Sequence, residues 1–244
     1  MFPLRDTVPR HYPPLVVWSL ILINSAIFLF QSGLPPEEQE WLVRHWGLVP
    51  ARYTDPVWAV INGLDPGNRL PFITNAFLHG GWLHLLGNMW TLWLFGSAVE
   101  DRLGMVRFIL FYLACALLAS VTHYLFNAAS QIPAIGASGA IAGIIGAYSM
   151  LFPRARIIVL VPVLFLPFFF ELPAAVFAGL WYLLQVLQGA GELLAPRLGG
   201  GVAWWAHIGG FVAGVALIRF IVPRYRRYHR DQGILGHGPH GERR

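Results

Sequence analysis

Four polar side chains stand inside or at the edge of long apolar stretches of this 244-residue chain: His84, Asn88, Ser138 and His207. Polar groups are costly in such surroundings, so each suggests a role. A serine hydroxyl is a weak nucleophile until a neighbouring base takes its proton, and an imidazole suits that task near neutral pH. Ser138 and His207 therefore predict a nucleophile and a general base, if the fold brings them together.

The other two polar residues fit a supporting role in acyl transfer. His84 and Asn88 are four residues apart and so share one face of a helix. Acyl transfer needs donors aimed at the developing oxyanion. We expect these donors to be His84, Asn88 and the backbone N–H of Ser138.

No carboxylate is expected beside His207, because the nearest candidates fall at the opposite ends of their helices: Glu100, Asp101 and Glu171. The sequence thus predicts a dyad of Ser138 and His207 rather than a triad.

Small residues surround the serine and follow the histidine. Gly136 precedes Ser138, and four-residue steps join Gly139 to Gly143 after the serine and Ala206, Gly210 and Gly214 around His207. Such spacing lets two membrane helices approach closely. It predicts that the two stretches pack against each other.

The composition indicates a polytopic membrane protein, because 56% of the residues are hydrophobic and only 12% are charged. The apolar blocks predict an all-α bundle of six transmembrane helices, in which the block after 156 is interrupted by three prolines. We expect the spans at residues 15–31, 81–99, 108–126, 138–151, 166–187 and 202–222. Residues 157–171 could form a loop or a helix, and an additional span there would move the C-terminus to the other side.

The bundle is expected to fill residues 1–222, with a basic, disordered cytoplasmic tail at 223–244. The long first outer loop, 32–78, contains a stretch with helical spacing and two tryptophans, Trp41 and Trp46, which predicts an interfacial helix. His79, at the start of the second span, is expected at the membrane interface.

All 17 basic residues are arginines, and 13 of them fall in segments that the six-span count places inside, against 4 outside. This asymmetry predicts that both termini are cytoplasmic. The net charge of +5 therefore reflects membrane topology and not nucleic-acid binding.

At these residues the sequence resembles the rhomboid family of intramembrane serine proteases. The resemblance rests on "GASG" with Ser138, "AHIGG" with His207, and "HGGWLHLLGNMWTLWLFGSAVEDRLG" from His79 to Gly104. It implies Ser138 as nucleophile, His207 as general base, and an oxyanion site of His84, Asn88 and the Ser138 backbone. It also implies transmembrane protein substrates within a lipid bilayer, cleaved near the outer face at small residues, without metal or cofactor.

Two positions depart from the family pattern. Many relatives carry an aromatic residue four positions after the serine, stacked on the histidine, where this chain has Ala142. Support for His207 is then expected from Trp204 or Trp205. Many relatives also carry a Trp–Arg pair in the first outer loop, whereas Arg69 has no adjacent tryptophan.

Other interpretations remain open at this point. Each polar residue alone could be structural, as a helix start or as hydrogen-bonded packing. The chain could be an inactive rhomboid-like protein that binds membrane clients, or a transporter or channel. The absence of an organelle signal favours a bacterial plasma membrane, while the natural substrate and the oligomeric state are left undetermined.

Overall fold

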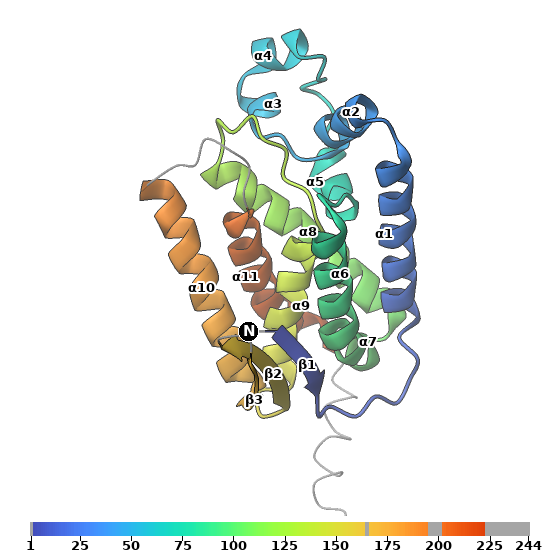
Figure 1. Ribbon diagram of the computed structural model, residues 1–244, viewed down its shortest axis with the longest axis vertical. Coiled ribbons are helices and arrows are strands. Elements are labelled where there is room, and N and C mark those ends of the chain that lie inside the picture. Colours follow the sequence, from blue (N-terminus) through green and yellow to red (C-terminus); the bar gives the residue numbers. More distant parts are fainter. Residues whose placement is uncertain (1, 164–165, 195–201, 223–244) are drawn as a thin grey trace, which may run out of the picture.

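The computed structural model describes residues 2–163, 166–194 and 202–222, which form a bundle made mainly of helices (Figure 1). Its helices are α1 (Leu15–Gly33), α2 (Pro36–Trp46), α3 (Ala51–Thr54), α4 (Pro56–Ile61), α5 (Pro71–Thr74), η1 (Asn75–Phe77), α6 (Trp82–Thr91), η2 (Leu92–Gly96), α7 (Ser97–Leu103), α8 (Met105–Phe126), α9 (Ser138–Leu151), α10 (Ala174–Leu194) and α11 (Trp204–Ile221). Within the described residues, α1, α8, α10 and α11 are long and apolar enough to cross a membrane. The predicted tail at 223–244 lies outside this part of the chain.

Most predicted spans coincide with helices. The spans expected at 15–31, 108–126, 138–151 and 202–222 correspond to α1, α8, α9 and α11. The span expected at 81–99 is built from α6, η2 and α7, which follow one another without a break. The middle piece, η2, is a π-helical turn that the apolar pattern does not reveal.

The prediction of a fifth helix from 166 to 187 is wrong in its first part. Strands β2 (Arg156–Val163) and β3 (Leu166–Pro173) form an antiparallel hairpin, and α10 begins only at Ala174. The hairpin is rich in β-branched and aromatic residues, which favour strands. Its prolines lack the N–H that a helix interior needs. Residues 157–163 and 166–171 are therefore strands and form neither a loop nor a helix.

The N-terminal segment supplies a third strand, β1 (Phe2–Asp6), which pairs antiparallel with β2 in the order β1-β2-β3. The expected all-α class is corrected accordingly. Side chains tie this sheet to the bundle, because the Trp90 indole donates to the Pro3 carbonyl at 2.7 Å and the Tyr148 hydroxyl donates to Asp6 at 2.8 Å. A pattern of apolar spans cannot reveal such a strand, since its partner is more than 150 residues away.

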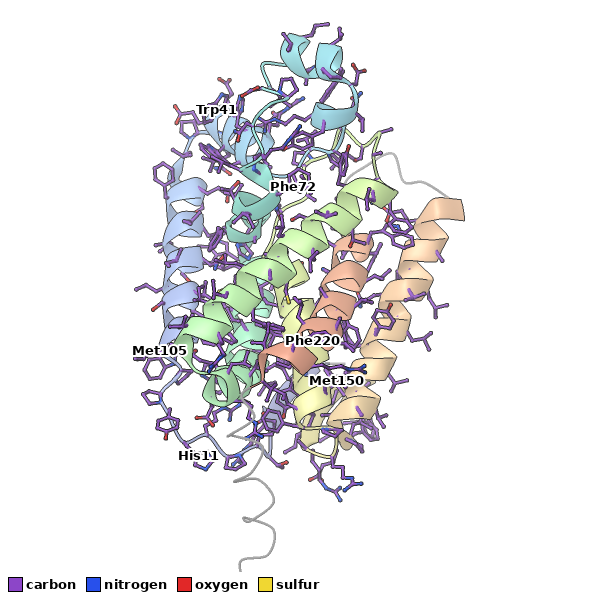
Figure 2. The ribbon with its side chains drawn as sticks, turned by 180° about the vertical axis from the view of Figure 1, so that it is seen from behind. His11, Trp41, Phe72, Met105, Met150 and Phe220 are labelled. Atoms are coloured by element: carbon purple, nitrogen blue, oxygen red, sulfur yellow. The ribbon has the colours of Figure 1, made fainter. Side chains whose placement is uncertain are left out.

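The connections gather at two opposite ends of the bundle (Figure 2). At one end, α2 to α5 meet the loop before α9 through a bridge between Leu48 and Ala134. The stretch predicted to be interfacial forms a helix there, α2, with Trp41 stacked on His45. The sheet and the segment around His11 lie at the other end.

The start of α1 depends on residues of α7. Helix α1 has no side-chain cap of its own, and the Glu100 carboxylate accepts instead from the N–H groups of Val16 and Val17, at 2.9 and 2.8 Å. Free N–H groups at a helix start need such an acceptor, and the positive end of the helix dipole favours an anion. Asp101 accepts from the N–H of Tyr12 just before the helix. The two acidic residues thus join the start of α1 to α7.

Replacing Glu100 by alanine should lower the free energy of unfolding by about 1.5–3 kcal/mol, because two helix N–H groups lose a charged acceptor. Thermal unfolding in detergent measures the change. The exposed Glu38→Ala variant is the control and should stay within about 0.5 kcal/mol of wild type. Equal stability of all three proteins would contradict the capping role.

Candidate active site

Ser138 is the first residue of α9, the helix at the centre of the bundle. Almost every later residue of α9 is buried by its neighbours. With 14 residues the helix is about 21 Å long, shorter than the ~30 Å of hydrocarbon in a bilayer. The hydroxyl is therefore carried at the end of a short helix, recessed within the bundle.

His207 lies in the first turn of α11 and is buried. Its Nε2 atom is 2.8 Å from the Ser138 Oγ, within hydrogen-bond distance. The structure thus brings together the two side chains that the sequence singles out, although they are 69 residues apart. No other side chain separates the hydroxyl from the imidazole.

Small residues allow this approach. A methyl group on Gly210 would overlap the Gly139 carbonyl, and one on Gly214 would overlap the Gly143 carbonyl. Any larger side chain would therefore force α9 and α11 apart. Ala206 completes the contact, since its Cβ lies 3.6 Å from the place a Gly139 methyl would occupy.

His84 and Asn88 on α6 lie close to Gly136, in the loop that precedes α9 and Ser138. Gly136 has φ +124°, and a methyl group there would come within 2.7 Å of the His84 Nε2 and 3.5 Å of the Asn88 Nδ2. Glycine is needed at this position both for its backbone conformation and for space. The loop residue before the serine is thus in close contact with both expected oxyanion donors.

Both side chains present donors with no acceptor of their own. Asn88 lines the cavity beside Ser138 and His207, and its buried Nδ2 has no hydrogen-bond partner among the described residues. The Gly80 N–H donates to the His84 Nδ1 at 3.3 Å, so a neutral His84 carries its proton on Nε2. These are the properties required of oxyanion donors.

Sequence reasoning missed two residues around the histidine. Gln185 on α10 is buried, and its Oε1 lies 2.8 Å from the His207 Nδ1. Trp181, one turn earlier, has its ring centre 5.9 Å from that of His207. A lone glutamine in the apolar run "WYLLQVL" is the signal that could have revealed Gln185, by the same argument that singled out the other polar residues.

The aromatic support expected for His207 is present in part. Trp204 meets the imidazole edge to face at 6.1 Å, whereas Trp205 stacks on Phe126 instead. His79 is not exposed as an interfacial residue would be. It is fully buried, and its ring packs against His84 at 5.2 Å.

Arg69 also finds an aromatic partner without an adjacent tryptophan. Its guanidinium lies 4.8 Å from the centre of the Tyr53 ring, a cation–π distance. An arginine–aromatic pair therefore forms here from residues that are not adjacent in the sequence.

Two cavities meet Ser138. One, of about 290 Å³, lies between α6, α9 and α10 and is lined by Asn88, Trp181 and His207, with Phe2 of β1 also on its wall. The other has a volume of about 20 Å³ and is lined mostly by small side chains, including Ala116. The described residues contain no cluster of three or more histidine, cysteine or acidic side chains that could hold a metal ion.

The sequence of this chain is similar to a known protein family and to several of its members. The model of a family described as "Rhomboid domain" matches residues 66–224.

The chain is 29% identical over 213 residues to Rhomboid protein 1, mitochondrial, of Saccharomyces cerevisiae, covering 84% of this chain and 53% of the yeast protein. It is 32% identical over 143 residues to the putative rhomboid protease YdcA of Bacillus subtilis, covering 59% of this chain and 64% of that protein. A shorter match to rhomboid protease GluP of Bacillus subtilis is 44% identical over 75 residues, which is 31% of this chain and 14% of GluP. The chain thus spans less than two thirds of these relatives.

Replacing Gly136 by alanine should slow the reaction of Ser138 with a fluorophosphonate probe by at least about 10-fold, because the new methyl group displaces His84 and strains the backbone at φ +124°. Gel-based labelling kinetics measure the rate. Gly33→Ala is the matched control, since a methyl group there meets nothing within 4 Å. Unchanged labelling of a folded Gly136→Ala protein would show that these contacts do not support the serine.

Proposed function

Because the chain belongs to the rhomboid family, we propose that it is an intramembrane serine endopeptidase. It hydrolyses peptide bonds in or near the transmembrane helices of membrane proteins. The observation that carries this proposal is the 2.8 Å contact between the Ser138 hydroxyl and the His207 imidazole. An inactive relative would have no need of this pair beside a cavity with free hydrogen-bond donors.

The reaction begins when the Ser138 Oγ attacks the carbonyl carbon of the scissile bond and its proton passes to the His207 Nε2. The oxygen that becomes negative is stabilised by the Asn88 amide, the His84 Nε2–H and the Ser138 backbone N–H. When the C–N bond breaks, His207 returns the proton to the leaving amine. A water molecule then attacks the acyl-enzyme by the same route and restores the serine. No step requires a metal or a cofactor.

The two cavities support a choice of substrate. The cavity of about 290 Å³ opens beside the catalytic pair and has room for a stretch of substrate chain. The cavity of about 20 Å³ that also touches the serine has room only for a small side chain. A small residue next to the scissile bond agrees with the preference that the rhomboid resemblance implies.

The topology we propose has six membrane-spanning helices: α1, the continuous α6–α7 segment, α8, α9, α10 and α11. The connections expected inside and those expected outside gather at opposite ends of the bundle, which supports this count. The excess of arginine in the inner segments supports cytoplasmic termini and a catalytic pair nearer the outer face. We place the protein in the plasma membrane of a bacterium, supported by its similarity to YdcA.

Cleavage of a single-span model substrate by the purified full chain tests the function. Wild type should cleave, whereas Ser138→Ala and His207→Ala should not. Asn88→Ala should be slower by about 10- to 1000-fold, because one oxyanion donor is lost. Gel analysis of the products measures the rates.

Two results would count against the proposal. Equal cleavage by wild type and Ser138→Ala would exclude Ser138 as the nucleophile. Binding of the substrate by wild type with neither cleavage nor fluorophosphonate labelling would favour the alternative, a rhomboid-like protein that binds membrane clients.

A further inference from the structure

The His207 ring uses both of its nitrogen atoms, and only one of them faces the serine. Its Nδ1 lies 2.8 Å from the Oε1 of Gln185, a buried residue of α10. We infer that Gln185 is the positioning residue of the catalytic pair. Its amide oxygen holds the imidazole in the tautomer and rotation in which Nε2 takes the Ser138 proton. This inference rests on the proposed function and adds a third member to the predicted dyad.

The direction of each hydrogen bond follows from the neighbouring groups. The Gln185 Nε2 lies 3.3 Å from the Trp181 carbonyl oxygen, which can only accept. The amide nitrogen therefore points along α10, and the amide oxygen points at His207. An amide oxygen can only accept, so the His207 Nδ1 carries the ring proton. The Nε2 lone pair is then directed at the Ser138 hydroxyl, as a general base requires.

The other contacts of the His207 ring cannot select the tautomer in which Nδ1 carries the proton. Trp181 and Trp204 touch the imidazole through their ring systems, and Ala142 offers no aromatic face. Such contacts hold the plane of the ring but do not distinguish its two nitrogen atoms. The hydrogen bond to Gln185 does, because a ring turned by 180° would face the amide with a carbon atom.

An amide suits this site better than a carboxylate in one respect. A carboxylate buried in the bundle would carry an uncompensated charge before the reaction starts. Gln185 supplies the acceptor without that charge. Two other titratable side chains act electrostatically on His207, namely His84 on α6 and His123 on α8, and neither is an anion.

Gln185→Met removes the acceptor while keeping the length of the side chain. With the full chain and the single-span substrate, kcat should fall by roughly 10- to 100-fold, with KM little changed, because the ring is free to adopt the wrong tautomer. Fluorophosphonate labelling of Ser138 should slow in parallel. Gln188→Met is the matched control, since Gln188 is exposed one turn further along α10 and should leave both rates unchanged.

Gln185→Glu separates positioning from mere packing. A carboxylate still accepts from Nδ1 and also stabilises the imidazolium, so activity should be kept within about 10-fold at alkaline pH. The acid limb of the pH–rate profile should move to higher pH. A residue that only fills space would tolerate methionine better than a buried carboxylate, so the order of the two variants would be reversed.

The outcomes distinguish this inference from the proposed function. Wild-type kcat in a folded Gln185→Met protein, or an unshifted acid limb in an active Gln185→Glu protein, would overturn the role of Gln185 alone. Failure of wild type to cleave or to label would instead overturn the function on which the role depends.

Discussion

The close contact between α9 and α11 is the constraint on which the site depends. Carbonyl groups of Gly139 and Gly143 lie where side chains on Gly210 and Gly214 would be, so the two helix backbones approach without intervening groups. Ser138 and His207 stand at the starts of these helices and meet at the same depth. A single additional methyl group in the contact would widen the distance between the Ser138 hydroxyl and the His207 imidazole.

A membrane interior also limits which groups can surround Ser138 and His207. Charges are expensive there, and neutral donors and acceptors perform the tasks that charged residues perform in water. Asn88 and His84 present N–H groups close to Ser138, and Gln185 accepts from His207 without being an anion. Acidic side chains are instead used at the end of the bundle, where Glu100 caps α1 and Asp6 accepts from Tyr148.

Most of the helices and the two central site residues could be predicted from the local sequence. Apolar length located α1, α8, α9 and α11, because a membrane span must bury a minimum number of residues in sequence. The cost of a polar group in lipid singled out Ser138 and His207 before any geometry was known. The same argument applies to Gln185, a neutral amide in a run of large apolar residues, although Gln185 is not among the site residues predicted from the sequence.

The sequence by itself thus determined the helical membrane class and the residues able to react, since length, hydropathy and side-chain chemistry are local properties. Only the tertiary structure decided that β1 pairs with the hairpin formed by β2 and β3, that Glu100 caps a helix begun 85 positions earlier, and that Gln185 faces His207. Each of these depends on hydrogen bonds between segments that are distant in the chain. Their partners are chosen by the packing of the whole bundle, which no local pattern records.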